Sequence, residues 1–228
     1  MSEQVRLMFS AISERYDVGN DILSLGVHRL WKRCMVRQAR APRGGRVLDL
    51  ATGTGDIALL FSNAVGPEGE VIGVDFCADM IEHARARPKN HRPNMRFEVG
   101  DAMNLRFGNN SFDVSSISFG IRNVDDPVKA LSEMHRVVKP GGRAVVLEFG
   151  QPRGLFGSIY RIYSDHILPF IGGIVTGDRE AYSYLNRTAA QFPCRDQFTD
   201  LMHSAGFRKA TWKALFGGIA FLYIGEVE

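Results

Sequence analysis

The sequence predicts a doubly wound α/β fold with a mostly parallel, seven-stranded sheet, and two observations predict it. Between residues 46 and 149, short runs rich in β-branched residues alternate with longer helical patterns, as in successive β–α–β units. Two more β-rich runs flank Gly217 and Gly218, which favours a C-terminal antiparallel hairpin. The expected strands cover residues 46–50, 70–75, 95–99, 112–117, 143–149, 208–213 and 219–226.

Helices are expected between these strands, over residues 56–65, 78–87, 127–138 and 194–205. The third of them begins at a proline and is stopped by Pro140, Gly141 and Gly142. Residues 1–43 favour two further helices, and the irregular, glycine-rich segment 150–193 is typical of a lid. We expect one domain over residues 1–228, made of a helical cap (1–43), a cofactor-binding core (44–149), the lid (150–193), and a final helix and hairpin (194–228).

Composition narrows the class of protein. The chain of 228 residues has a formal net charge of +3, too small by itself to indicate nucleic acid. Its three cysteines show no close pairing, which argues for a reducing compartment and against a zinc site. The first residues lack the layout of a signal peptide, and the longest apolar stretch, 167–175, is too short to span a bilayer. We expect a cytoplasmic protein without a metal.

Positive charge is concentrated in one segment. Residues 28–46 contain seven arginines and lysines and no acid. One interpretation is a solvated helix face. The other is attraction to an anionic membrane surface, which would place the protein at the periphery of the inner face of the membrane.

The strongest motif is a glycine loop after the first expected strand. Residues 47–56 read VLDLATGTGD, an apolar strand that runs into Gly53 and Gly55 just before a helix N-terminus. Such glycines let the backbone turn tightly and approach a ligand. Because Ala58 completes a G-x-G-x-x-A pattern, the loop alone fits a dinucleotide as well as other adenosine cofactors.

Two acids indicate which cofactor binds there. Asp75 ends the second expected strand, 20 residues after Gly55, where a carboxylate can accept both ribose hydroxyls of an adenosine. Asp49 lies four residues before Gly53. A carboxylate there would oppose a pyrophosphate but would attract an ammonium group. Asp49 therefore favours S-adenosylmethionine over a dinucleotide.

Polar groups also follow the next two strands. Asp101 follows the third strand, where an acid can receive an adenine amino group, and Ser118 follows the fourth, at the edge where open α/β sheets bind ligands. Asp101 as a cap and Ser118 as a turn residue are the alternatives. We also place Met80, on the helix after Asp75, among the cofactor contacts.

Four segments together resemble the ubiquinone/menaquinone biosynthesis C-methyltransferase family over nearly the whole chain. They are residues 16–33, the glycine loop 49–56, residues 118–124 (SFGIRNV), and residues 136–143 (RVVKPGGR) leading to 147–149 (LEF). The resemblance implies a Rossmann-like class I methyltransferase of the demethylmenaquinone type. It implies S-adenosyl-L-methionine as cofactor, and it adds Thr54 and Ala102 to the cofactor contacts.

The resemblance implies methylation of a ring carbon of a polyprenyl hydroquinone, with demethylmenaquinol to menaquinol favoured over a ubiquinone precursor. Such a carbon becomes nucleophilic when a neighbouring hydroxyl loses its proton, so a base and a cation would assist. Our catalytic candidates are Arg122, Asn123 and Tyr16. Because Arg122 is permanently charged, it would orient water or steady the oxyanion; the alternative is a surface arginine in an ion pair.

Three other functions remain open from the sequence. The first is a small-molecule O- or N-methyltransferase of the same fold, and the second is a nicotinamide-dependent oxidoreductase that uses the glycine loop. The third is a non-catalytic subunit that binds S-adenosylmethionine. As partners we expect a lipophilic quinol and no nucleic acid, and the sequence leaves room for peripheral membrane contact and for a homodimer.

Overall fold

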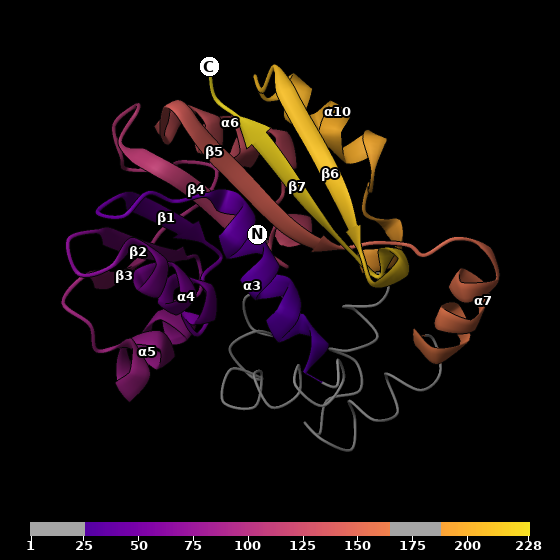
Figure 1. Cartoon of the computed structure of the whole chain (residues 1–228), viewed down its shortest axis with the longest axis horizontal. Coiled ribbons are helices and arrows are strands. Elements are labelled where there is room, and N and C mark those ends of the chain that lie inside the picture. The colour runs from indigo at the N-terminus through magenta and orange to yellow at the C-terminus, as the bar shows by residue number, and fades with distance from the viewer. Residues whose placement is uncertain (1–25, 165–187) are drawn as a thin grey trace.

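Seven strands form one sheet in the computed structural model, which describes residues 26–164 and 188–228 (Figure 1). Their order across the sheet is β3-β2-β1-β4-β5-β7-β6. Strands β1 to β5 are parallel, whereas β7 is antiparallel to both β5 and β6. The strands are β1 (Arg46–Leu50), β2 (Glu70–Asp75), β3 (Met95–Val99), β4 (Phe112–Ser118), β5 (Val138–Phe149), β6 (Lys209–Leu215) and β7 (Ala220–Glu226).

Helices connect the parallel strands. The described α-helices are α3 (Val27–Ala39), α4 (Asp56–Val65), α5 (Ala78–Ala86), α6 (Pro127–Val137), α7 (Gly154–Ile162) and α10 (Asp196–Ser204), with short 3-10 turns η1 (Pro88–Asn90), η2 (Ile121–Asn123) and η4 (Phe216–Gly218). Helix α6 begins where the sequence favours it. The Asp126 side chain accepts a hydrogen bond from the backbone N–H of Lys129, and Pro127, in the first turn, has no backbone N–H that would need an acceptor.

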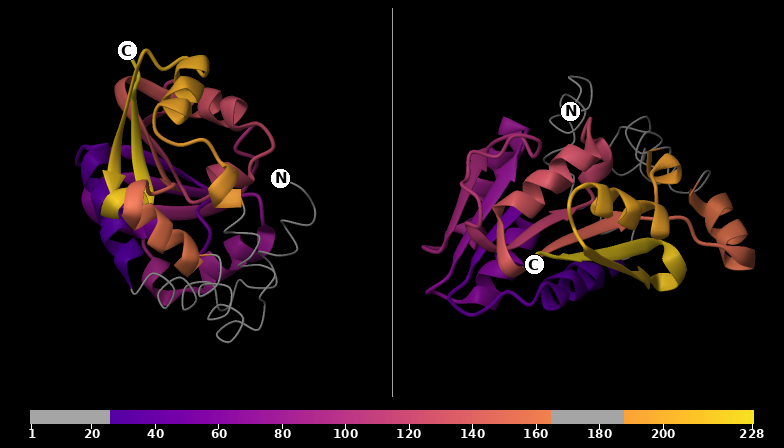
Figure 2. Two further views of the ribbon diagram at one scale, coloured as in Figure 1. Left: turned by 90° about the vertical axis from the view of Figure 1, so that its right-hand side faces the viewer. Right: turned by 90° about the horizontal axis from the view of Figure 1, so that it is seen from above.

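The sheet separates two apolar cores, which gives the molecule three layers (Figure 2). One core joins the sheet to α3, α4 and α5 through Met35, Phe61 and Ile81. The other joins the opposite face to α6 and α10 through Met134 and Phe198. Because both faces are covered, the inner strands are buried along most of their length, as expected of a parallel sheet.

The sequence-based prediction of the fold class is confirmed, with differences in detail. The bounds of β1, β2, β3 and α4 agree with the expected ranges. The fifth strand, expected over 143–149, begins at Val138 instead, because Val138 pairs with Phe112 and a register shift follows. Pro140, Gly141 and Gly142, which were expected to separate the preceding helix from this strand, belong to the strand. The Gly141 N–H donates to the Val227 carbonyl beyond the end of β7.

The segment expected to be an irregular lid also differs. Residues 154–162 form helix α7, which extends away from the end of β5 (Figure 1). Residues 165–187 of that segment, and the first helix expected within 1–43, lie outside the described residues. Within 26–164 and 188–228, the structure holds no helix that is both long and apolar enough to cross a membrane.

Candidate active site

The carboxyl ends of β1, β2, β3 and β4 meet at one edge of the sheet, and the strand order reverses between β1 and β4. Ligands of open α/β sheets bind at such a reversal point. The backbone is strained at two places on this edge. Ala51, after β1, and Phe119, after β4, have φ of 47° and 56°, in the left-handed region that non-glycine residues rarely adopt.

The glycine loop links β1 to α4. Its Gly53 has φ of 54°, and a Cβ atom built there would meet nothing within 4 Å, so the space beside this backbone is open. Gly55 differs, because a Cβ atom there would lie 2.7 Å from Asn90 Nδ2 and 2.8 Å from a ring carbon of Phe97. Gly55 therefore serves close packing under the loop, whereas Gly53 leaves room for a ligand.

Asp75 ties the end of β2 to this loop. One carboxylate oxygen accepts a hydrogen bond from the Gly53 N–H at 2.8 Å, and the other accepts from the Cys77 N–H at 2.9 Å. Burial raises the pKa of Asp75, and the backbone hydrogen bonds oppose that rise. Each carboxylate oxygen keeps a further lone pair, so this acid can still accept hydroxyl groups from a ligand.

Asp49 is buried next to the carboxyl end of β1, as its penultimate residue. The hydroxyl groups of Thr52 and of Ser116, on the neighbouring strand β4, each donate to its carboxylate at 2.7 Å. Burial raises the pKa of Asp49 to about 7, although the two hydroxyl groups and the nearby Lys32 lower it. Asp49 therefore gains or loses its proton near neutral pH. A cation bound close to Asp49 would favour the ionised carboxylate.

The other expected cofactor contacts lie along the same edge. Asp101 accepts a hydrogen bond from the Met103 N–H at 2.9 Å, and Ala102 beside it is half-buried. Met80 is buried on α5. Thr54 is buried as well, and its carbonyl accepts hydrogen bonds from Asn90 and Arg87.

The polar groups after β4 form a second cluster. The Arg122 and Glu148 side chains are 2% and 1% exposed and form an ion pair at 2.6 Å. Arg122 also donates to the Phe119 carbonyl at 2.6 Å, and its guanidinium lies 5.3 Å from the centre of the Phe149 ring. The interpretation of Arg122 as a surface ion-pairing residue is therefore wrong, because its ion pair joins η2 to β5 away from solvent.

This cluster contains several polar atoms without a partner. Among the described residues, no hydrogen bond reaches the buried atoms Ser118 Oγ, Arg122 Nε, Asn123 Oδ1 and Glu148 Oε2. The other carboxylate oxygen of Glu148, Oε1, accepts two hydrogen bonds, one from the Arg122 side chain and one from the Phe149 N–H. Burial raises the pKa of Glu148, and the charge of Arg122 opposes that rise. Unsatisfied buried groups are rare in folded proteins and need an explanation.

Comparison with known proteins identifies the family. The model of the ubiE/COQ5 methyltransferase family matches residues 1–226. The ubiquinone/menaquinone biosynthesis C-methyltransferase UbiE of Bdellovibrio bacteriovorus is 51% identical over 228 residues, which cover 99% of this chain and 97% of that protein. The chain belongs to this methyltransferase family.

A second relative supports the family assignment, and two solved structures share the fold. The demethylmenaquinone methyltransferase of Deinococcus radiodurans is 42% identical over 225 residues, covering 98% of this chain and 92% of that protein. A SAM-dependent methyltransferase structure from Thermotoga maritima aligns with a TM-score of 0.67 at 21% identity, covering 97% and 98% of the two chains. A phosphoethanolamine N-methyltransferase of Haemonchus contortus, in complex with S-adenosyl-L-methionine, has a TM-score of 0.63 at 16% identity, covering 87% of this chain and 52% of that one.

The protein is thus an S-adenosylmethionine-dependent methyltransferase, as the sequence predicted. Of the predicted site residues, the structure brings Asp49, Asp75 and the glycine loop together in one network. Arg122 and Asn123 lie in the second cluster, on η2 after β4. Tyr16 lies outside the described residues.

Two side chains at this edge were not among the predicted site residues. Phe76 directly follows Asp75, and 40% of it is exposed. Phe76 could have been predicted from the sequence, because a large aromatic residue directly follows the acid expected to bind the ribose. Glu148 was visible at the end of a strand, but its pairing with Arg122, 26 residues earlier, has no local signature.

Proposed function

We propose that this methyltransferase transfers the methyl group of S-adenosylmethionine to a ring carbon of a polyprenyl hydroquinone, with demethylmenaquinol as the favoured acceptor. The observation that carries the proposal is the 51% identity, over nearly the full length of both chains, to a protein named as a quinone-biosynthesis C-methyltransferase. The relative from D. radiodurans is named for demethylmenaquinone alone, which supports the naphthoquinol over the benzoquinol.

The residues at the carboxyl edge suit the cofactor. The open space beside Gly53 admits a ligand, and the free lone pairs of Asp75 can accept the ribose hydroxyls. Phe76 and Val99 are 40% and 43% exposed between Asp75 and Asp101, so an adenine ring would cover apolar surface there. We assign the cofactor to Asp49, Gly53, Thr54, Gly55, Asp75, Met80, Asp101, Ala102 and Ser118.

When bound, the cofactor supplies a methyl group on a sulfonium, which needs alignment with the acceptor more than elaborate activation. The buried carboxylate of Asp49 would hold the cofactor's ammonium, because opposite charges attract strongly away from water. This contact would also fix the direction in which the methyl group points along the sheet edge.

The second cluster would handle the proton of the acceptor. As the ring carbon bonds to the methyl carbon and the carbon–sulfur bond breaks, a neighbouring ring hydroxyl would give up its proton. The methylated ring carbon would then lose its hydrogen as a proton and the ring oxygen would be protonated again, which restores the aromatic hydroquinone and leaves S-adenosylhomocysteine and one proton. The unpartnered Oε2 of Glu148 would accept that proton, directly or through water, while Arg122 Nε donates to the phenolate oxygen that forms. Asn123 would orient the acceptor with its free carbonyl oxygen, and Tyr16 stays a candidate for covering the site.

Where the protein works follows from this substrate. A polyprenyl quinol resides in the membrane, so we propose a cytoplasmic enzyme with peripheral contact at the inner face. The cap (1–43) and the lid (150–193) would enclose the acceptor, and a homodimer stays part of the proposal.

The test is methylation by the purified enzyme with labelled S-adenosylmethionine and a short-chain demethylmenaquinol, with and without dithionite. We expect product only with dithionite, because only the reduced ring has a hydroxyl to deprotonate. Cofactor binding without product would reject the acceptor, and benzoquinols and soluble phenols would be tested next. Equal activity on soluble phenols would favour the O-methyltransferase alternative.

A further inference from the structure

Helix α3 and its C-cap residue carry a row of exposed arginines. Arg33 and Arg37 lie four residues apart, which places them on one side of the helix, and Arg40 is the C-cap residue directly after it. All three are exposed, and Arg29 extends the row by a further turn. The opposite side of α3 is buried in the core through Trp31, Met35 and Ala39. We call Arg33, Arg37 and Arg40 the arginine row.

No acid of the described chain neutralises this row. Neither an ion pair nor a hydrogen bond joins Arg33, Arg37 or Arg40 to another side chain within residues 26–164 and 188–228. On the neighbouring α4, Asp56 is paired with Lys32, Lys89 and Arg87. The two lysines hold the pKa of Asp56 well below its usual range, although burial raises it. The positive charge of the row is therefore available to a partner.

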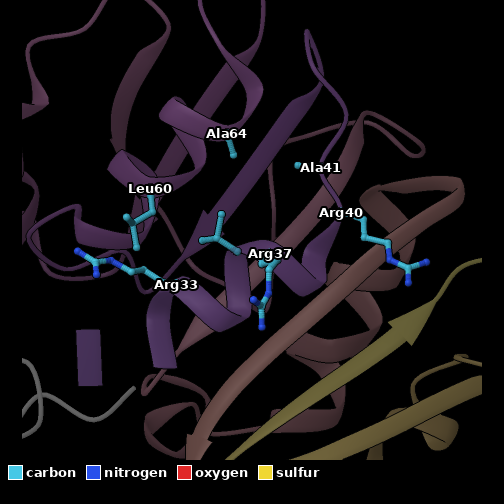
Figure 3. A pocket seen from close by; sticks show the side chains of 7 residues that line it. Arg33, Arg37, Arg40, Ala41, Leu60 and Ala64 are labelled. Atoms are coloured by element: carbon cyan, nitrogen blue, oxygen red, sulfur yellow. The ribbon is translucent and has the colours of Figure 1, made fainter. Parts of the chain in front are cut away.

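A hollow of about 310 Å³ lies between α3 and α4 along this row (Figure 3). Its apolar lining consists of Val36, Ala41, Leu60 and Ala64. In Figure 3, Arg33 and Arg40 extend to opposite sides of the hollow, and Arg37 lies between them. The three guanidinium groups spread apart, so they suit a plane of negative charges better than one small anion.

An apolar surface lies at the end of α3 that is nearest the active site. The Trp31 ring lies 6.3 Å from that of Phe119, after β4, and 6.3 Å from that of Phe216 on η4. Leu30 and Phe216 are 54% and 58% exposed there, and Phe156 of α7 contacts the backbone at Gly217 and is 47% exposed. Exposed apolar side chains beside a cationic row are typical of proteins that rest on a bilayer.

We propose that this face of the molecule docks onto an anionic phospholipid bilayer. The arginine row would lie along the lipid phosphates, the hollow between α3 and α4 would receive part of one lipid, and the apolar surface would enter the interface. This orientation would bring the apolar end of α3, which lies beside Phe119 at the carboxyl edge of the sheet, to the membrane surface. The inference rests on the proposed function, because a membrane-resident quinol gives the docking its purpose.

The test is co-sedimentation of the full-length protein with vesicles that contain no quinol. One set consists of equal parts phosphatidylglycerol and phosphatidylcholine, and the other consists of phosphatidylcholine alone. We expect binding to the anionic vesicles and its loss at high salt, since screening weakens exposed charges. With the Arg33→Ala and Arg37→Ala double variant, we expect affinity on the order of 30-fold lower.

Matched controls keep the result interpretable. Lys129→Ala with Arg208→Ala removes the same charge from exposed positions on α6 and before β6, and should bind nearly as wild type does. Alanine favours helix, so the α3 variant should stay folded, which thermal unfolding verifies. Its turnover of a short-chain soluble quinol should equal that of wild type. A failure of docking is thereby distinguished from a failure of the proposed reaction.

Three results would overturn the proposal. They are equal binding to both kinds of vesicle, unchanged binding of the α3 double variant, and release of the protein by free glycerol phosphate. Tighter binding to a duplex oligonucleotide than to anionic vesicles would assign the row to nucleic acid and would overturn it as well.

Discussion

The two halves of the sheet edge differ in how their polar groups are satisfied. At β1 and β2, each carboxylate oxygen of Asp49 and Asp75 accepts a hydrogen bond from the chain itself. At the end of β4, on η2 and at the end of β5, by contrast, lie four of the six buried side-chain atoms without a partner in the described part of the chain. The hydrogen bonds of the first half are made within the chain, whereas the second half has polar atoms that we propose for the acceptor, on Arg122, Asn123 and Glu148, and for the cofactor, on Ser118.

This difference predicts that changes in the two halves have separable effects. A change in the first half should weaken cofactor binding, and one in the second half should slow methyl transfer with the cofactor still bound.

The largest effect is expected from Glu148→Gln. Glutamine can keep the bonds from Arg122 and the Phe149 N–H, but it cannot accept a proton. We expect kcat for the quinol to fall about 100-fold or more, the range of general-base catalysis. Calorimetry should show nearly unchanged S-adenosylmethionine affinity.

Glu133→Gln is the matched control, because Glu133 is also paired with an arginine, Arg136, but lies on α6 away from the edge. It should leave kcat unchanged. Wild-type turnover in Glu148→Gln would remove Glu148 from the mechanism.

The next effect is expected from Asp75→Asn. The amide group would bring an N–H toward either the Gly53 or the Cys77 N–H, and it cannot give both hydroxyls of a ribose a charged acceptor. We expect the Kd of S-adenosylmethionine to rise roughly 10- to 100-fold. Calorimetry with Asp79→Asn, an exposed acid on α5, provides the comparison. Equal affinities of the two variants would contradict the assignment of Asp75.

A smaller effect concerns pH. Because the pKa of Asp49 is raised to about 7, the acid is mostly neutral at pH 6 and mostly ionised at pH 8. If its carboxylate holds the cofactor's ammonium, affinity should increase roughly tenfold between these values. Asp49→Asn should abolish that slope, and an unchanged slope in the variant would assign it to another group.

The raised pKa of Asp49 also makes the stability of the folded state depend on pH. The folded-state pKa of Asp49 lies above its ordinary value of 3.8, so the folded state holds its proton more tightly. This residue therefore contributes stability that is complete below pH 3.8 and is lost as the pH rises through about 7.

The smallest effect on binding is expected at the glycine loop. Gly53→Ala places a methyl group in the open space, so it should weaken cofactor binding a few-fold and destabilise the fold by about 1–2 kcal/mol through backbone strain. Gly55→Ala collides with Asn90 and Phe97 and should destabilise the fold more. Thermal unfolding with and without cofactor separates the two effects, and the reverse order would contradict the different roles of these glycines.

The difference between the two halves of the edge also separates the features that the sequence could predict from those that it could not. The bounds of β1, β2 and β3 followed from short apolar runs, and Asp49, Asp75 and the glycine loop followed from spacing along one β–α–β unit. The early start of β5 at Val138 was missed because it depends on pairing with Phe112 across the sheet. Helix α7 was missed because Gly154 and Gly157 weaken its local helical signal.

The Glu148–Arg122 pair was beyond prediction for a related reason. Nothing local to either residue indicates that β5 and η2 bring them together away from water. Chemistry that lies within one β–α–β unit can be predicted from spacing, whereas chemistry assembled between distant strands needs the fold.

Transfer of the methyl group to a ring carbon of a reduced quinol distinguishes the proposed reaction from O-methylation by an enzyme of the same fold. The most direct measurement uses S-adenosylmethionine with a carbon-13 methyl group, the purified enzyme and reduced short-chain demethylmenaquinol, and locates the label in the product by NMR. We predict a methyl signal bonded to the aromatic ring carbon. A signal bonded to oxygen would contradict the account and would identify an O-methyltransferase.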